Sequence, residues 1–149
     1  MSSAPGTLTG IKVVEVGEGI AGPFGTRLLA MMGAEVVKFE DPVGGDWTRR
    51  AVHVEGEPSE QPENPFFYYL NADKMSVTAD LSTEAGRVRL LSALSDADVL
   101  LVAGSARQIR TWGLTEDDLR ERFPRLVLTT ITPYGFAGTM SELDGDDLT

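Results

Sequence analysis

The chain has 149 residues, the size of about one domain. Hydrophobic residues make up 42% of it and charged residues 24%, a composition that excludes a largely disordered or fibrous protein. The net charge of −10 argues against nucleic acid or an anionic membrane as a partner, and zero Cys with one His excludes disulfides, thiolate sites and a His-rich metal site, so we expect no metal.

Residues 1–9 are small and mostly polar and are expected to form a flexible lead-in. They have neither the basic start nor the apolar core of a secretory signal. No run in the chain approaches the roughly 18 apolar residues of a membrane span. We therefore expect a cytoplasmic protein.

The next segment predicts a strand, a turn, a helix and a second strand. Residues 11–16 are short, rich in β-branched side chains and flanked by glycines, which is typical of a buried strand. The glycine-rich residues 17–22 predict a turn, and Pro23 suits the first position of a helix that we expect to end near Met32. Residues 35–40 predict the second strand. Such a unit begins a parallel α/β sheet.

Residues 41–65 hold several Gly and Pro residues and few periodic apolar positions, so we expect a long loop there. The aromatic run at 66–70 is expected to be a short packed helix or strand. Together the patterns predict, for residues 10–149, an α/β domain with a Rossmann-like parallel sheet and helices on both faces. Further strands are expected at 76–79, 98–102 and 126–131, and further helices from Ser82 or Thr83 to about Ser95 and from Thr115.

The glycines Gly17, Gly19 and Gly22 form a G-x-G-x-x-G pattern between the first strand and the first helix. Glycines there allow close backbone approach, a helix N-terminus receives phosphate, and Glu40 at the end of the second strand suits a ribose contact. An FAD or NAD site is therefore one hypothesis. A glycine corner that only permits a tight strand-to-helix turn is the alternative, and the adjacent acid Asp41 favours it by crowding the adenosine end.

A series of short motifs in order resembles the N-terminal portion of the family III CoA-transferases, which include carnitine CoA-transferases, formyl-CoA transferases and 2-methylacyl-CoA racemases. Among the motifs are A-G-P-F, M-G-A-E-V-V-K-F-E-D-P, G-G-D-W-T-R and S-D-A-D-V-L-L. The resemblance covers nearly all of residues 10–149. The matching segments are 10–23, 29–40, 45–49, 71–81, 97–102, 113–126 and 132–138.

The resemblance implies that the domain binds the coenzyme A of an acyl-CoA across loops at the carboxyl ends of its strands. It also implies that a small carboxylic acid is the other substrate. Lys74 is a candidate phosphate contact or a residue that fixes the start of its strand, and Arg110 lies within reach of the nucleotide. Partly backbone contacts are implied at Gly19, Ile20, Ala21, Ala79, Leu81, Ala103 and Gly104.

Three positions depart from the family pattern. Asp41 stands where the family often has Arg, Ala103-Gly104 replaces a Glu-Asn-Phe motif, and Thr111 replaces another Arg, although Arg107 and Arg110 are near. Because each lost charge-assisted hydrogen bond costs about 1.5–3 kcal/mol, we expect weak or no CoA binding by the chain alone.

The resemblance also places the nucleophilic Asp of the transferases downstream of the segment that matches residues 144–149, so we expect no catalytic residue in this chain. In the racemases a catalytic His precedes an Asp, whereas here Asp146 precedes Asp147. A racemase-type member, an FAD or NAD module, and a non-catalytic subunit or interaction domain remain alternatives. The resemblance implies a homodimer or a complementing C-terminal chain.

Two smaller predictions concern the long loop. Asp46 and Arg49 belong to a family motif and are expected to pair with each other and hold the loop. His53 has no partner at a catalytic spacing and is expected to be an ordinary surface residue.

Overall fold

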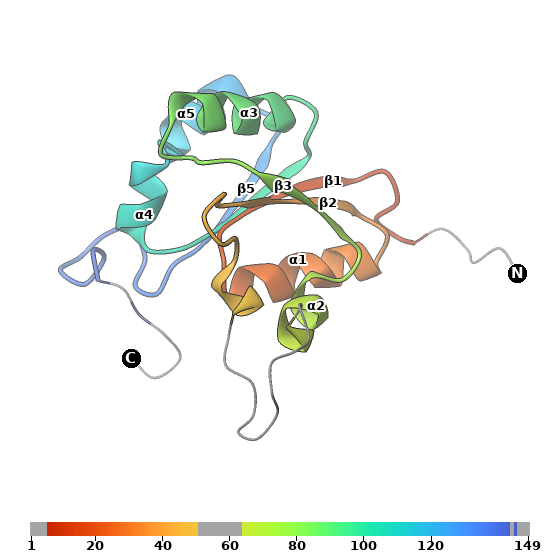
Figure 1. Ribbon diagram of the computed structural model, residues 1–149. Helices are drawn as coiled ribbons and strands as arrows, with labels where there is room; N and C mark the ends of the chain where they lie inside the picture. Colours follow the sequence, from red (N-terminus) through yellow and green to blue (C-terminus); the bar gives the residue numbers. More distant parts are fainter. Residues whose placement is uncertain (1–5, 51–63, 144, 146–149) are drawn as a thin grey trace, which may run out of the picture.

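Five parallel strands form one sheet at the centre of the molecule (Figure 1). The computed structural model describes residues 6–50, 64–143 and 145. The strand order is β3-β2-β1-β4-β5, so the chain changes direction across the sheet between β1 and β4. The strands are β1 (Lys12–Val16), β2 (Glu35–Glu40), β3 (Lys74–Thr78), β4 (Val99–Ala103) and β5 (Val127–Ile131).

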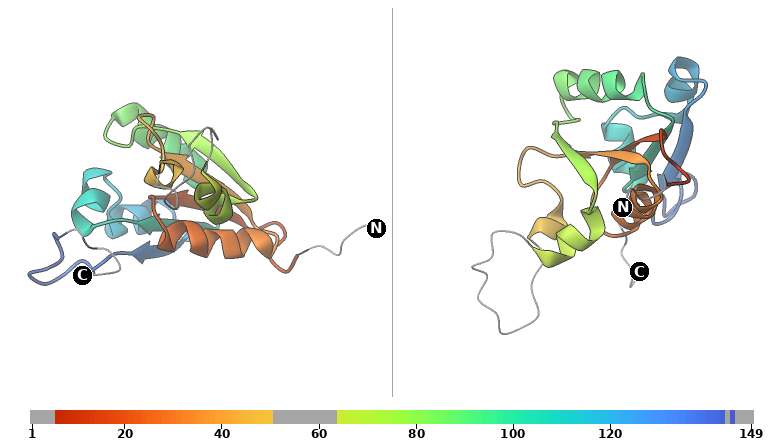
Figure 2. Two further views of the ribbon diagram at one scale, coloured as in Figure 1. Left: turned by 60° about the horizontal axis from the view of Figure 1, so that its bottom comes forward. Right: turned by 90° about the vertical axis from the view of Figure 1, so that its right-hand side faces the viewer.

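Helices cover both faces of this sheet, as Figure 2 shows. One face carries α1 (Ala21–Met31) and α2 (Pro65–Asn71). The other carries α3 (Glu84–Leu94), α4 (Ala106–Thr111) and α5 (Glu116–Arg122). The predicted parallel α/β sheet with helices on both faces is therefore confirmed.

Alternation along the strands divides the apolar side chains between two cores. Val14 and Val16 of β1 face the larger core, where they pack with Leu90 and Leu94 of α3. Val13 lies on the α1 side with its neighbours on β2. Glu15, two residues after Val13, points to the same side of β1 and is fully buried. A charge inside a core requires partners, and these form the site described below.

Several elements differ from the prediction in extent. Helix α1 begins at Ala21, so Pro23 is its third residue, where the backbone N–H would also lack an intrahelical partner. The aromatic run is a helix, α2, because Asn64 caps it and Pro65 occupies its first turn. Strand β3 begins at Lys74, two residues earlier than expected.

Three further segments bear on the sequence predictions. The described part of the expected long loop contains a 3-10 turn, η1 (Trp47–Arg49). Helix α4, which was not predicted, is capped by Ser105. In the expected lead-in, Leu8 packs against the core beneath α1 and donates its N–H to the Met32 carbonyl at 2.9 Å. His53, Asp146 and Asp147 lie outside the described residues.

Candidate functional site

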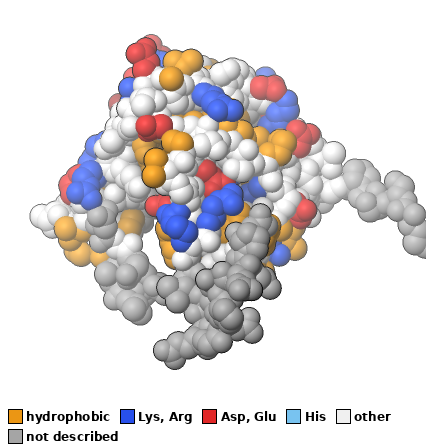
Figure 3. Space-filling model, in the orientation of Figure 1, with side chains coloured by type: hydrophobic (Ala, Val, Ile, Leu, Met, Phe, Trp, Pro, Cys, Tyr) orange, Lys and Arg blue, Asp and Glu red, His pale blue; other side chains and the backbone are white. Residues whose placement is uncertain are grey.

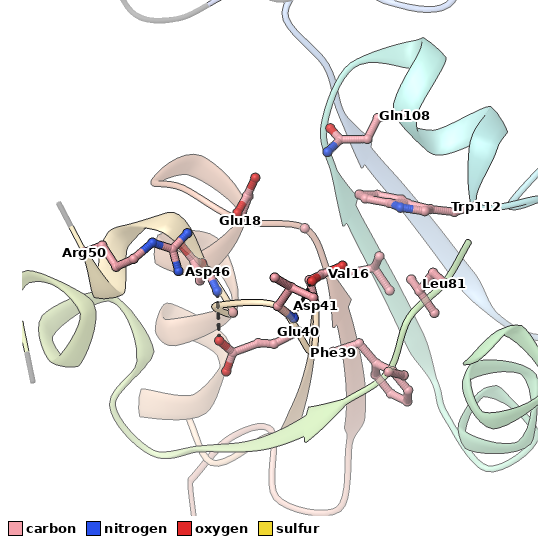
Figure 4. A pocket seen from close by; sticks show the side chains of 14 residues that line it. Val16, Glu18, Phe39, Glu40, Asp41, Asp46, Arg50, Leu81, Gln108 and Trp112 are labelled. Carbon is pink, nitrogen blue, oxygen red and sulfur yellow. Dashed lines mark hydrogen bonds between the residues drawn. The ribbon is translucent and has the colours of Figure 1, made fainter. Parts of the chain in front are cut away.

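A cavity of about 290 Å³ opens at the carboxyl ends of β1 and β2, where ligands bind in open parallel sheets. In Figure 4, Gln108 and Trp112 of the α4 region form one wall, and Arg50 and Asp46 lie on the opposite side. Its lining comprises Val16, Gly17, Glu18, Phe39, Glu40, Asp41, Val43, Gly45, Asp46, Arg50, Ala79, Leu81, Gln108 and Trp112.

The glycine loop, residues 17–19, borders this cavity and requires glycine at both ends. Gly17 has φ +126°, and a Cβ there would lie 2.1 Å from the carbonyl oxygen of Ala103. Gly19 has φ +91°, and a Cβ there would lie 3.1 Å from the Trp47 ring nitrogen. These glycines permit close approach to β4 and to the 44–50 segment, so tight packing alone explains their presence.

Beneath the glycine loop, a buried charge network joins β1, β2 and β3. Glu15 accepts hydrogen bonds from Lys38 and Lys74, both at 2.8 Å, and from Thr26 at 2.6 Å. Lys38 lies opposite Glu15 in the parallel register, so the pairing of the strands brings the two together. Lys38 also lies 2.9 Å from Asp46 as an ion pair.

The pKa values of the two lysines are shifted in opposite directions. Burial lowers the pKa of Lys38, but the carboxylates of Glu15 and Asp46 outweigh it, so that the pKa is raised. Burial lowers the pKa of Lys74, and here its attraction to Glu15 does not compensate. The Lys74 ammonium also donates to the Pro23 carbonyl at 2.7 Å and to Asn71 at 3.0 Å.

Glu40, at the end of β2, is enclosed by donors. Arg49 donates to both carboxylate oxygens at 2.8 Å, Ser76 donates at 2.6 Å, and the Asp46 N–H donates at 3.0 Å. Burial raises the pKa of Glu40, but these hydrogen bonds outweigh it and lower the pKa from 4.5 to about 2. The carboxylate is thus ionised and already bound within the protein.

This arrangement corrects one prediction and weakens another. The Arg49 N–H donates to the Asp46 carbonyl at 3.0 Å, but their side chains form ion pairs with other residues: Asp46 with Lys38, and Arg49 with Glu40. The loop is therefore tied to the sheet by two separate ion pairs. Glu40, the candidate ribose contact of a dinucleotide site, has its oxygens occupied by Arg49, Ser76 and the Asp46 N–H.

A second hollow of about 450 Å³ adjoins the first cavity across α4. Glu18, Gln108 and Trp112 line both spaces. The second hollow is completed by Ser105, Arg107 and Thr111.

The charges around the first cavity are mixed. Glu18 accepts a hydrogen bond from the backbone N–H of Trp47 at 3.1 Å, and Asp41 accepts one from the backbone N–H of Val43 at 2.6 Å. Arg50 lies at the rim and donates to the Gly44 carbonyl. Basic and acidic side chains are likewise interspersed on the face shown in Figure 3. Asp41 adds a carboxylate to this rim, at a position where the sequence resemblance implies Arg.

The structure brings some of the predicted site residues to the cavity. Ala79 and Leu81 line it, and both are buried. Ala103 ends β4 against Gly17, and Gly104 follows it beside Gln108. Both residues therefore lie at the end of β4, just before α4 begins.

Other predicted residues lie elsewhere. Ile20 is the N-cap of α1 and Ala21 is its first residue, directly after the glycine loop. Lys74 lies at the amino end of β3, bound to Glu15 and apart from the residues that line the cavity. Arg110 pairs with Glu142 and donates to the Phe136 carbonyl at 3.2 Å.

The sequence analysis missed several lining residues, among them Gln108 and Trp112. Gln108 and Trp112 belong to the α4 region, which was not predicted to be helical. The available signal was Ser105, which accepts from the Gln108 N–H as an N-cap.

Neither a metal-binding cluster nor a membrane-spanning helix is found among the described residues. No group of three or more His, Cys, Asp or Glu side chains there is arranged to hold a metal ion. None of the helices in the described part of the chain is long and apolar enough to span a bilayer.

Comparison with known proteins places these features in a family context. The sequence model of the family described as CoA-transferase family III matches residues 8–149 of this chain. Cinnamoyl-CoA:phenyllactate CoA-transferase of Clostridium sporogenes is 36% identical over 149 residues, which is all of this chain and 36% of that protein. Succinate–glutarate CoA-transferase of Agrobacterium fabrum is 34% identical over 142 residues, 94% of this chain and 36% of that protein.

A solved structure agrees with these matches. The crystal structure of a CAIB/BAIF family protein from Brucella suis superposes with a TM-score of 0.83 at 34% sequence identity, covering 97% of this chain and 38% of that one. The chain thus spans little more than a third of the length of the curated relatives that it matches.

Proposed function

The chain belongs to CoA-transferase family III, and from this premise we propose that it binds the coenzyme A part of an acyl-CoA in the cavity at the carboxyl ends of β1 and β2. The binding serves transfer of CoA between carboxylic acids. The two relatives compared above carry names of such transfers, between cinnamate and phenyllactate and between succinate and glutarate.

The observation that supports this proposal most directly is the convergence of separate chain segments on one cavity. The glycine loop and the 79–81 segment, which both belong to matching motifs, meet Gln108 and Trp112 of the α4 region there. Leu81, Phe39 and Val16 offer an apolar floor, and Trp112 offers an aromatic ring. Much of the remaining lining is polar or charged, and it includes Glu18, Asp41 and Gln108, which can orient a ligand on this apolar floor.

The charges suggest how a nucleotide would lie. Asp41 lines only the first cavity and Arg107 only the second hollow, whereas Glu18 lines both, so we propose that the phosphates of CoA lie toward the second hollow. The first cavity then receives the less charged part of the ligand. The same acids support the expectation that the chain alone binds CoA weakly.

The reacting carboxylate is proposed to come from polypeptide downstream of residue 149, as the family resemblance implies. A carboxylate nucleophile divides one difficult acyl transfer into two easier steps through a covalent intermediate. We further propose a cytoplasmic protein that works as a homodimer or with a chain supplying the C-terminal part. The acyl group and the acceptor are small carboxylic acids in this proposal.

Fluorescence of the chain tests the CoA site. The two tryptophans are Trp47 and Trp112, so Trp47→Phe leaves Trp112 as the sole indole reporter. We expect millimolar CoA to change the emission of this variant. Trp112→Phe, the matched control, retains only Trp47 and should respond less. No change of the Trp112 emission with CoA, or a stoichiometric complex with FAD or NAD, would overturn the proposal.

An acyl-exchange assay tests where the reacting carboxylate lies. The chain alone should show no exchange, and the chain together with the downstream polypeptide should be active. Full turnover by these 149 residues alone would show that the nucleophile is among them.

A further inference from the structure

The carboxylate of Asp46 is buried directly against the glycine loop. Its Oδ1 accepts from the Gly19 N–H at 3.2 Å, from the Thr48 N–H at 2.9 Å and from the Thr48 hydroxyl at 2.7 Å. Only 2% of Asp46 is exposed. The residue lies 27 positions after Gly19 in the sequence, so the contact is tertiary and not a local turn.

The cation that balances Asp46 also holds the glycine loop. Lys38 Nζ lies 2.9 Å from Asp46 Oδ2 and donates to the Gly17 carbonyl at 2.9 Å. One buried ion pair therefore binds the carbonyl at one end of the loop and the N–H at the other. Glu15 fixes Lys38 from the opposite side at 2.8 Å.

In nucleotide-binding α/β proteins, the N–H groups of the glycine turn and the N-terminus of the following helix receive a phosphate anion. We propose that in this chain the Asp46 carboxylate takes that anion position itself. Asp46 is then a positioning residue that fixes the glycine loop and keeps the diphosphate of any ligand away from the Gly19 N–H.

Electrostatics supports this role. A diphosphate at the Gly19 N–H would have to displace a buried, ion-paired carboxylate or lie beside it as a like charge, and both are costly in a medium of low polarity. The chain thus keeps the sequence pattern of a phosphate-binding turn. The Gly19 N–H, which would donate to a phosphate, donates to Asp46 instead. This inference goes beyond the proposed function, since it does not require that CoA binds.

The proposal predicts rescue of a cavity variant by a small anion. Asp46→Ala removes the carboxylate and leaves Lys38 and the Gly19 N–H facing a space of its size. We expect a lower thermal midpoint for this variant, and recovery of more than half of the loss in formate. The recovery should grow with the logarithm of the formate concentration once formate exceeds its dissociation constant, as binding to the native state requires, and chloride at equal ionic strength should recover less.

Two variants serve as controls for that rescue. Asp46→Asn fills the same space with a neutral amide, so it should be destabilised without rescue by formate. Asp117→Ala removes an exposed carboxylate from the first turn of α5 and should show neither effect. Equal responses of Asp46→Ala to formate and chloride would overturn the proposal, because they would indicate a general salt effect.

A measurement on the unaltered chain applies even if the variants do not fold. In a titration with inorganic pyrophosphate followed by NMR, the Gly19 amide resonance should stay in place. It should also be protected from hydrogen exchange. A saturable shift of Gly19 with pyrophosphate would overturn the proposal. Neither measurement uses CoA, so failure here is distinguishable from failure of the proposed CoA site.

Discussion

Replacement of Arg49 by Met should destabilise the protein through Glu40. The guanidinium donates two hydrogen bonds of 2.8 Å to a carboxylate whose side chain is only 3% exposed. Lowering the pKa of Glu40 from 4.5 to about 2 corresponds to about 3 kcal/mol of stability at neutral pH. Because Ser76 and the Asp46 N–H supply part of this, we expect Arg49→Met to cost about 2 kcal/mol.

Urea unfolding followed by circular dichroism measures this loss. With a slope of about 1–3 kcal/mol/M, the midpoint should fall by about 1 M urea at pH 7. Arg49→Lys is the matched variant: it keeps the charge but cannot donate to both oxygens in the same way, so it should lie between Arg49→Met and the unaltered chain.

The pH dependence gives an independent measure of the same interaction. The folded-state pKa of Glu40 lies below its ordinary value, so its contribution is fully present above pH 4.5 and is lost as the pH falls toward 2. Arg49→Met should reduce this acid-induced loss, and Glu40→Gln should abolish Glu40's share of it.

A double-mutant cycle completes the test. In the Glu40→Gln background, Arg49→Met should cost much less than it does alone. The contact of the guanidinium with the Phe67 ring, 3.7 Å from the centroid, is common to both backgrounds and cancels. Equal costs in the two backgrounds, or an unchanged acid profile in Arg49→Met, would refute the assignment of this stability to Glu40.

Three further substitutions, two of them with a matched control variant, have expected outcomes that thermal and urea unfolding can measure. Gly17→Ala would place a Cβ 2.1 Å from a carbonyl oxygen of β4 and should prevent normal folding, whereas Gly25→Ala, whose Cβ has its nearest neighbour at 3.8 Å, should be neutral or stabilising. Leu90→Ala empties a fully buried position and should cost about 2–5 kcal/mol, against less than about 0.5 kcal/mol for the exposed Val88→Ala. Thr83→Ala removes the N-cap of α3 and should cost about 1 kcal/mol; no loss would indicate that water replaces the cap.

The periodicity of the sequence predicted most of the backbone. The β-branched runs at 11–16 and 35–40 became β1 and β2, and the capping residues Thr83 and Thr115 precede helices as expected. Helix α4 was missed because it is one short element of six residues, and its stability comes from Ile109 packing in the core rather than from a long periodic pattern.

The family motifs indicated the site segments but not how their side chains pair. Asp46 and Arg49 are neighbours in the sequence, yet each binds a residue of β2 instead, Lys38 and Glu40. Nothing local favours these pairs, since they depend on how the loop folds back over the sheet.

The amino-acid sequence by itself determined the parallel α/β fold and the family, because local periodicity and short motifs are properties of contiguous residues. Only the tertiary structure decided that Lys38 lies opposite Glu15, that Asp46 binds the Gly19 N–H, and that Trp112 and Leu81 line one cavity. The physical reason is that strand register and loop closure choose partners far apart in the chain, and burial then makes those pairings strong.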